Sequence, residues 1–241
     1  MNIKHTFFDV KELVLETGSF IRNEIQKIHS RDIELKGVND FVTYVDKFSE
    51  QKLVNGLLNI IPDSGFITEE KTINKKGEIY NWIIDPLDGT TNYIHGLPPY
   101  SISIALTEND KIILGVVYEI CLNELFYSWE AGAAYLNGKV ISVSHTAKVS
   151  DSLIATGFPY HDYHRIRQYI ELLEYFLRHS HGIRRFGSAA TDLAYVACGR
   201  FDAFYEYSLN VWDVAAGAFI VQQAGGKVFD FKGGNNWLYG S

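Results

Sequence analysis

The sequence predicts an α+β protein in which helices and mixed β-sheets form separate layers. Three observations support this class: the first 60 residues are mainly helical in their apolar spacing, the pattern becomes strand-rich from Tyr100, and helices and strands then intermix without regular β-α-β alternation. This order differs from that of a doubly wound parallel sheet. No Gly-x-Gly-x-x-Gly motif follows a predicted strand, which argues against a dinucleotide-binding fold.

The N-terminal part is predicted to contain two helices and two short strands. Apolar residues have helical spacing from Phe7 to Ile28, and a second helix begins at Asp46, its predicted N-cap, and stops at Pro62. Between them we expect a polar loop over 36–40 and a strand or extended arm over 41–45. The remaining segments are a short strand at 66–67, a charged loop over 71–78 and a buried strand at 82–84.

The C-terminal part is predicted to alternate between strands and helices. Strands are expected over 101–106, 112–118, 125–129, 201–205 and 228–229, and helices over 165–177, 189–198 and 211–224. Asn137-Gly138-Lys139 predicts a tight turn, and Gly225-Gly226 ends the last helix. We find no repeat or linker, so we expect one domain over 1–241, with halves of about 1–140 and 141–241.

Composition and charge exclude several classes of protein. The 241 residues are 46% hydrophobic, which is enough for a sizeable core. A net charge of −7 argues against a nucleic-acid or anionic membrane surface, and suits an anionic substrate only if bound cations reverse the local sign. Cys121 and Cys198 lie far apart, so neither a disulfide framework nor a cysteine zinc site is expected. Without a signal core or an apolar run of about 18 residues, we expect a cytoplasmic protein.

The segment from Trp82 to Asn92 contains the most informative motif. A buried strand ends in Asp85 and Asp88, separated by Pro86-Leu87, and Gly89 then begins a predicted short helix. Proline makes the turn stiff, so both carboxylates and the carbonyl of Leu87 can face one cavity. Backbone N–H groups at the start of a helix can bind phosphate oxygens beside these metal ligands.

Further acidic residues extend this candidate site. Glu69 and Glu70 follow another short strand, and Asp213 begins the last helix. Clustered carboxylates repel one another, and Mg²⁺, which prefers oxygen ligands, removes that conflict. Two metal ions about 4 Å apart would stabilise the attacking and leaving oxygens of an in-line displacement. In isolation, Asp85 and Asp88 would be ordinary turn and cap residues, but the flanking elements favour the metal site.

These motifs resemble those of the inositol monophosphatase family, whose members are magnesium-dependent, lithium-sensitive phosphatases. The matching segments occur in the family's order and span nearly the whole chain: Asp40 to Asp46, Thr68-Glu69-Glu70, Asp85 to Asn92, Arg185 to Ala190 and Val211 to Gly217. The resemblance implies a layered α-β-α-β-α sandwich and a homodimer. It also implies hydrolysis of a small phosphate monoester, with myo-inositol monophosphate as the first candidate.

The resemblance also implies a role for each motif residue. Glu69 and the Leu87 carbonyl would bind the first of two or three Mg²⁺ ions, Asp88 and Asp213 the second, and Asp85 would bridge them. Catalysis would be carried by Glu69 and Thr90, which hold the attacking water, and by Asp46, acting through Thr90 or a third ion. The remaining implied residues bind substrate: Gly89, Thr90 and Thr91 at the phosphate, and Ala189, Glu206 and Lys36 beside it. For Glu206 and Lys36, an ordinary solvated position remains the alternative.

Several alternatives stay open at this stage. Related enzymes act on fructose 1,6-bisphosphate, 3′-phosphoadenosine 5′-phosphate or histidinol phosphate, and some bacterial family members bind the transcription machinery. Thr68 stands where the family usually has glycine, and the loop over 71–78 is short. Family members usually continue through another strand and helix after the position of Gly225-Gly226, so the resemblance implies a shortened C-terminal end.

Overall fold

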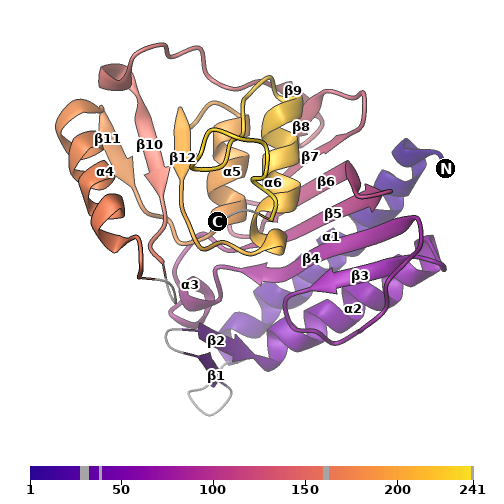
Figure 1. Cartoon of the computed structure of the whole chain (residues 1–241). Coiled ribbons are helices and arrows are strands. Elements are labelled where there is room, and N and C mark those ends of the chain that lie inside the picture. Colours follow the sequence, from indigo (N-terminus) through magenta and orange to yellow (C-terminus); the bar gives the residue numbers. More distant parts are fainter. Residues whose placement is uncertain (28–32, 38–39, 160–162, 240–241) are drawn as a thin grey trace.

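The computed structural model describes residues 1–27, 33–37, 40–159 and 163–239, which form five layers (Figure 1). The layers run in the order helix, sheet, helix, sheet, helix, as the family resemblance implies. The helices are α1 Ile3–Glu24, α2 Tyr44–Ile60, α3 Thr90–Ile94, α4 Ile166–His179, α5 Ala189–Ala197 and α6 Val211–Gln223. The strands of the large sheet are β3 Gly65–Thr68, β4 Tyr80–Asp88, β5 Ser101–Glu108, β6 Lys111–Glu119, β7 Glu124–Trp129, β8 Ala134–Leu136 and β9 Lys139–Ile141.

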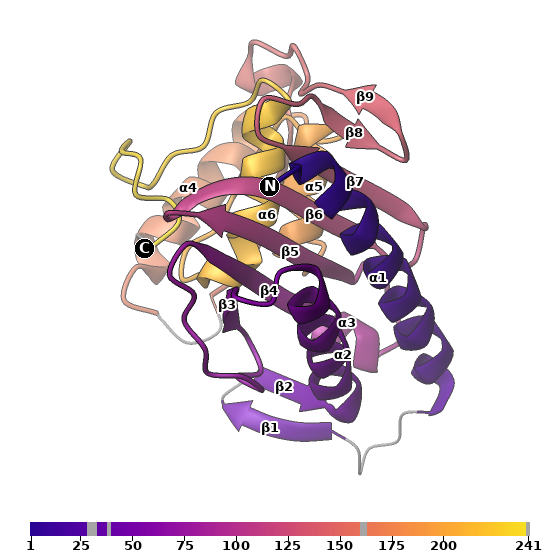
Figure 2. The same ribbon diagram turned by 90° about the vertical axis from the view of Figure 1, so that its right-hand side faces the viewer.

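The large sheet separates two hydrophobic cores. Its strands lie in sequence order, with β3 and β4 parallel and the other pairs antiparallel. Because neighbouring residues of a strand point to opposite faces, Ile84 packs in the core with α1 and α2, whereas Ile83 packs in the core with α5 and α6 (Figure 2). A Cβ atom at Gly115 would lie 2.9 Å from the Ala216 carbonyl oxygen, so α6 needs glycine there to approach β6.

A small parallel sheet forms the fourth layer. Its strands are β10 Leu153–Thr156, β11 Gly182–Arg184 and β12 Ala203–Tyr205, in the order β11-β10-β12. Helices α5 and α6 lie on one side of this sheet, and α4 covers the other (Figure 1). Because all three strands are parallel, their carboxyl ends meet at one edge, where ligand sites commonly form in parallel sheets.

The structure corrects four details of the sequence analysis. Thr43, rather than Asp46, is the N-cap of α2: its hydroxyl accepts from the Val45 N–H, and Asp46 at the third helical position accepts from the Thr43 N–H. Lys36 belongs to a strand, β1 Ile33–Gly37, which pairs with β2 Asp40–Thr43, rather than to a loop. Residues 228–229 do not form a strand, and the short strands from β8 to β11 were not predicted.

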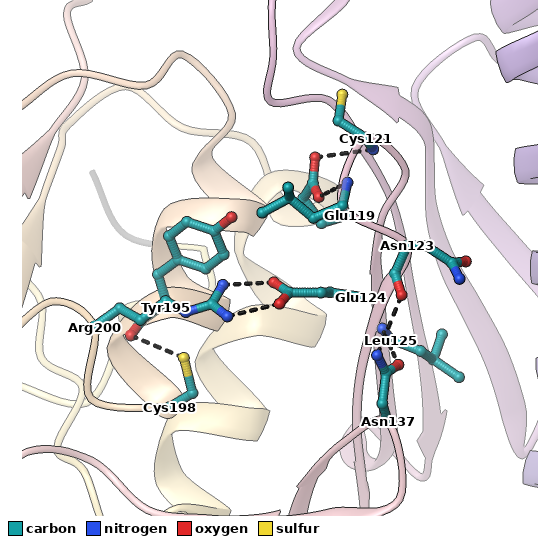
Figure 3. Close-up of polar contacts among 10 residues, drawn as sticks. Glu119, Cys121, Asn123, Glu124, Leu125, Asn137, Tyr195, Cys198 and Arg200 are labelled. Carbon is teal, nitrogen blue, oxygen red and sulfur yellow. Dashed lines mark hydrogen bonds and ion pairs between the residues drawn. The ribbon is translucent and has the colours of Figure 1, made fainter.

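Polar contacts connect the end of α5 to β7 of the large sheet and stabilise the turn between β6 and β7 (Figure 3). Arg200, just after α5, binds both carboxylate oxygens of Glu124 at the start of β7, with one N–O distance of 2.6 Å. Its guanidinium carbon lies 4.6 Å from the centre of the Tyr195 ring. Buried Glu119 accepts from the backbone N–H groups of Cys121 and Leu122, which closes the turn between β6 and β7.

Within the described ranges, no helix combines the length and the apolar character that crossing a bilayer requires.

Candidate active site

A cavity of about 470 Å³ lies where the two sheets approach each other around the N-terminus of α6. One wall comes from the ends of β3 and β4, and the other from the carboxyl ends of the small sheet. Its lining includes ten residues that the sequence analysis placed in the site: Glu69, Asp85, Leu87, Asp88, Gly89, Thr90, Thr91, Ala189, Glu206 and Asp213. The fold therefore brings together side chains separated by up to 144 positions of the chain.

The end of β4 arranges the first two carboxylates. The register between β4 and β5 shifts between Asp85 and Asp88, so the residues from 85 to 88 depart from regular alternation. Asp85 is 2% exposed, and its Oδ1 accepts from the Leu87 N–H at 2.9 Å. The Oδ2 atom of Asp88 accepts from the Ser188 hydroxyl at 2.5 Å and from the Ala190 N–H at 2.8 Å. Asp88 is thereby fixed against the start of α5.

Gly89 and Thr90 form the turn that follows. Gly89 has φ of +93°, and a Cβ atom there would lie 3.0 Å from the Pro99 carbonyl oxygen, so both conformation and space require glycine. The Thr90 hydroxyl lies 2.9 Å from both Asp46 Oδ1 and the Leu87 carbonyl oxygen, either of which can accept its proton. The side chain of Thr90 thus connects the turn to the carbonyl of Leu87, a candidate metal ligand.

Asp46 lies behind this turn and does not line the cavity. The side chain is 1% exposed, and its Oδ2 accepts from the Thr43 N–H at 2.8 Å and the Thr43 hydroxyl at 2.6 Å. Asp46 thus contacts Thr90, which does line the cavity, and its catalytic role stays a prediction.

Glu69 and Asp213 enter the cavity from two other elements. Glu69 follows β3, and its N–H donates to the Ile84 carbonyl oxygen at 3.2 Å, which continues the pairing of β3 with β4. Asp213 lies in the first turn of α6, where its Oδ2 accepts from the Asn210 N–H at 2.6 Å. The four acidic residues therefore reach one place from the ends of three elements.

Burial and mutual repulsion raise the pKa values of these acids. Burial is the largest cause for Asp85, followed by the charges of Glu69, Asp88 and Asp213. Burial also raises the pKa of Asp213, followed by the charge of Asp88. For Asp88, burial outweighs the hydrogen bonds from Ser188 and Ala190, which lower its pKa. Such a group of carboxylates is stabilised in its ionised form by a bound cation.

The donor set fits Mg²⁺ in its chemistry. Carboxylate oxygens and one backbone carbonyl are the hard ligands that this ion prefers, and the described residues that line the cavity include no cysteine or histidine. Over the part of the chain that the structure describes, no three His, Cys, Asp or Glu side chains converge into a preformed metal site. The fit therefore rests on the identity of the donors and on their repulsion, rather than on converged ligand atoms.

The opposite wall contains residues that could contact the rest of a substrate. Glu206 follows β12, and burial together with Asp192, Asp213 and Asp88 raises its pKa, which Arg185 opposes. Ala189 lines the cavity at the first residue of α5. The side chain of Lys36 lies outside the part of the structure that is described, so its predicted role stays a prediction.

Sequence reasoning gave no role to several residues in this wall or beside it. Arg185 lines the cavity, and its guanidinium carbon lies 5.5 Å from the centre of the Phe158 ring. Gly157 also lines the cavity. Asp192 is 1% exposed, and neither of its carboxylate oxygens has a hydrogen-bond partner among the described residues. Arg185 belongs to the motif Arg185 to Ala190 that resembles the family. Gly157 had no signal in the sequence, because it matters only through the side chain that it lacks.

Comparisons with known proteins agree with the fold and the cavity. A family model described as "Inositol monophosphatase family" matches residues 4–241. The "Inositol-1-monophosphatase" of Mesorhizobium japonicum is 35% identical over 228 residues, which cover 94% of this chain and 86% of that protein. The "Putative Nus factor SuhB" of Neisseria meningitidis serogroup B is 44% identical over 204 residues, with 84% and 78% covered.

Solved structures give the same result. The extragenic suppressor protein suhB of Bartonella henselae has a TM-score of 0.89 at 36% identity, with 96% of this chain and 89% of that chain covered. The IMPase of Thermotoga maritima has a TM-score of 0.88 at 36% identity, with 98% and 89% covered. Fold and sequence together define a phosphatase. The chain belongs to the inositol monophosphatase family.

Proposed function

We propose that this protein is a magnesium-dependent phosphomonoesterase that hydrolyses myo-inositol monophosphate to myo-inositol and phosphate. One observation carries the proposal: Glu69, Asp85, Asp88 and Asp213 line the same cavity as the Gly89-Thr90-Thr91 turn. A phosphate monoester bound with divalent cations needs both features, because its negative charge requires cations and its oxygens require donors. The relatives named inositol-1-monophosphatase support the choice of substrate.

The proposed metal ligands are those that the family resemblance implies, and all of them line the cavity. Glu69, Asp85 and the Leu87 carbonyl would hold one ion, and Asp85, Asp88 and Asp213 a second, with a third more weakly bound. Bound magnesium supplies positive charge that polarises water and offsets the charge that develops on the phosphoryl oxygens.

Residues of the chain would bind the phosphate group, orient the attacking water and take up its proton. The backbone N–H groups at Thr90 and Thr91, in the first turn of α3, have no partner within the helix and can donate to phosphate oxygens. Thr90 Oγ1, held between Asp46 Oδ1 and the Leu87 carbonyl, can accept from the attacking water once its own proton is directed to Asp46. The carboxylate of Glu69 is the base that takes the proton of that water.

The substrate-side wall would select the leaving group. Glu206 and the backbone N–H of Ala189 can bind hydroxyl groups of a polyol, and Lys36 remains a candidate from the β1–β2 hairpin. These contacts favour a leaving group with several hydroxyls over a simple alcohol.

Phosphate release from a substrate panel tests the proposal. The panel contains inositol 1-phosphate, fructose 1,6-bisphosphate, adenosine 3′,5′-bisphosphate and histidinol phosphate, each with and without magnesium. We expect the highest kcat/KM for inositol 1-phosphate and no turnover in EDTA. A higher value for another member reassigns the substrate within the same chemistry, and magnesium-independent turnover contradicts the mechanism.

A binding role with the transcription machinery is a second candidate function. Several relatives carry the name "Nus factor SuhB" or "Putative Nus factor SuhB" and are 37–44% identical to this chain. Co-purification of RNA polymerase with the full chain from its own cells would support this role, and its absence at high protein concentration would contradict it. The Asp213→Ala variant should separate the two functions, because it removes a metal ligand without altering the outer surface.

We also propose that the protein acts in the cytoplasm as a homodimer, as the family resemblance implies. Multi-angle light scattering of the purified chain checks the oligomer: twice the mass of 27.4 kDa is expected, and the monomer mass at micromolar concentration contradicts it.

A further inference from the structure

The residue that follows each strand of the small parallel sheet lines the substrate-side wall of the cavity: Gly157 after β10, Arg185 after β11 and Glu206 after β12. In the register of the small sheet, Thr156 of β10 lies opposite Tyr205 of β12, so Gly157 and Glu206 are the first residues past the two strand ends. The Thr156 hydroxyl donates to the Tyr205 carbonyl oxygen at 2.8 Å, which fixes this register at the cavity. Gly157 and Glu206 are therefore neighbours across the two strand ends.

The carboxylate of Glu206 occupies the space that a side chain at Gly157 would fill. A Cβ atom there would lie 1.8 Å and 2.2 Å from the two Glu206 carboxylate oxygens and 2.0 Å from Cδ, far inside van der Waals contact. The φ angle of Gly157 is outside the left-handed range, so its backbone accepts any L-residue. Space alone requires glycine here.

Glu206 keeps its acceptor atoms available to a ligand. Among the described residues, no hydrogen-bond donor contacts its carboxylate, although the side chain lines the cavity opposite Asp88 and Asp213. The carboxylates of Asp88 and Asp213, by contrast, accept bonds from the protein. Because no described residue donates to it, the position of the Glu206 carboxylate depends on the packing against Gly157.

We infer that Gly157 is a positioning residue: it leaves room for the Glu206 carboxylate to face the cavity, and so sets the preference for phosphates whose leaving group carries hydroxyls. This inference rests on the proposed function, because a phosphate ester must be the substrate for the preference to matter. A methyl group at 157 displaces the far end of a flexible side chain rather than backbone, so the strand ends should keep their register.

Kinetics on two substrates tests the inference. Gly157→Ala, Glu206→Ala and the double variant are assayed with inositol 1-phosphate and with ethyl phosphate, whose leaving group has no further hydroxyl. Because one charged hydrogen bond is worth about 1.4 kcal/mol or more, the ratio of the two kcat/KM values should fall about tenfold in each single variant. Gly157→Ala should cause no further fall in the Glu206→Ala background.

A compensating variant separates positioning from general damage. Aspartate is one methylene shorter than glutamate, so Gly157→Ala/Glu206→Asp should regain part of the ratio lost in Gly157→Ala. The inference is overturned if Gly157→Ala keeps the wild-type ratio, lowers both substrates equally, or adds its full effect to Glu206→Ala.

A crystal structure of Gly157→Ala decides the point independently of turnover. We expect the Glu206 carboxylate to have moved away from residue 157 while β10 and β12 keep their pairing. An unmoved carboxylate overturns the positioning role. If the wild-type protein hydrolyses neither phosphate, the proposed function fails, and this structural readout still tests the packing of Glu206 on Gly157.

Discussion

The two walls of the cavity hold their acidic residues in opposite ways. On the large-sheet side, protein donors occupy the carboxylates: Asp88 accepts from Ser188 and Ala190, and Asp85 accepts from the Leu87 N–H. On the small-sheet side, the described residues offer no donor to Glu206, which lies against a glycine. The first wall therefore fixes its oxygens before a ligand arrives, whereas the second leaves an acceptor for the ligand.

This difference separates chemistry from selectivity. Substitutions on the large-sheet side should reduce turnover of every substrate together with magnesium binding. Those on the small-sheet side should change which substrate is preferred and leave magnesium affinity nearly constant.

The largest effect is expected from removing a ligand of the second metal. Asp88→Asn and Asp213→Ala should each lower kcat by more than about 1000-fold, because lost charge at the developing oxyanion is among the strongest catalytic effects. Steady-state phosphate release measures the change. Asp88→Asn keeps an acceptor for Ser188 and Ala190, so it should remain folded.

Asp151→Asn is the matched control, since Asp151 is exposed at the end of a short 3-10 helix, Val149–Asp151, and does not line the cavity. It should retain wild-type turnover. Near-normal rates in either Asp88→Asn or Asp213→Ala would remove the metal site from the mechanism.

Magnesium should stabilise the large-sheet side of the cavity and remove the loss of folding stability that Asp85 causes as pH rises. Burial and neighbouring acids raise the pKa of Asp85, so the folded protein retains a proton that the unfolded chain releases near pH 4. Without magnesium, this carboxyl therefore reduces the free energy of unfolding as pH rises above about 4. Asp85→Asn lacks that penalty, so its stability advantage over wild type should grow with pH.

Denaturant melts between pH 4 and 8, with and without magnesium, measure this effect. At 100 times its dissociation constant, magnesium should add about 2.7 kcal/mol to wild type and much less to Asp85→Asn. A magnesium-free difference that shrinks as pH rises would show that the sign is wrong.

Glu206→Ala should act on selectivity. We expect about a tenfold loss of kcat/KM for inositol 1-phosphate, equivalent to about 1.4 kcal/mol, with little change in the magnesium concentration needed for half-maximal rate. Glu171→Ala, on the exposed side of α4, provides the control. A large shift in magnesium requirement with unchanged preference would reject the substrate contact.

The smallest effect is expected far from both walls. Glu124→Gln weakens the pair with Arg200, whose side chains are 16% and 38% exposed, and should lower the free energy of unfolding by about 0.5–1 kcal/mol. Phosphate release should stay unchanged. A loss of activity larger than twofold would mean that the end of α5, including Tyr195, is coupled to the site.

The large-sheet side was predictable because its residues carry chemical signals. Asp85-Pro86-Leu87-Asp88 follows a run of apolar residues, and the structure places it at the end of β4, as predicted. Long periodic segments also predicted α6 to within one residue, and they predicted α1 as a helix whose bounds differ by four residues at each end. The capping of α2 was wrong because Thr43 and Asp46 are both good cap residues, and only their reciprocal bonds decide between them.

The small-sheet side was largely invisible in the sequence. Strands β10 and β11 have four and three residues, too few for a recognisable alternation, and they form only by pairing with segments distant in the chain. The last predicted strand, at 228–229, pairs with no strand in the part of the chain that the structure describes. Gly157 illustrates the same limit, because the need for glycine arises only once Glu206 lies beside it.

Anomalous diffraction from a crystal soaked in manganese, a substitute for magnesium, tests the central claim most directly. We predict anomalous density between Glu69, Asp85, Asp88 and Asp213, with the Leu87 carbonyl as a further ligand. If a crystal soaked at a manganese concentration that supports turnover shows no anomalous density among these carboxylates, the metal-dependent mechanism and the proposed function are contradicted.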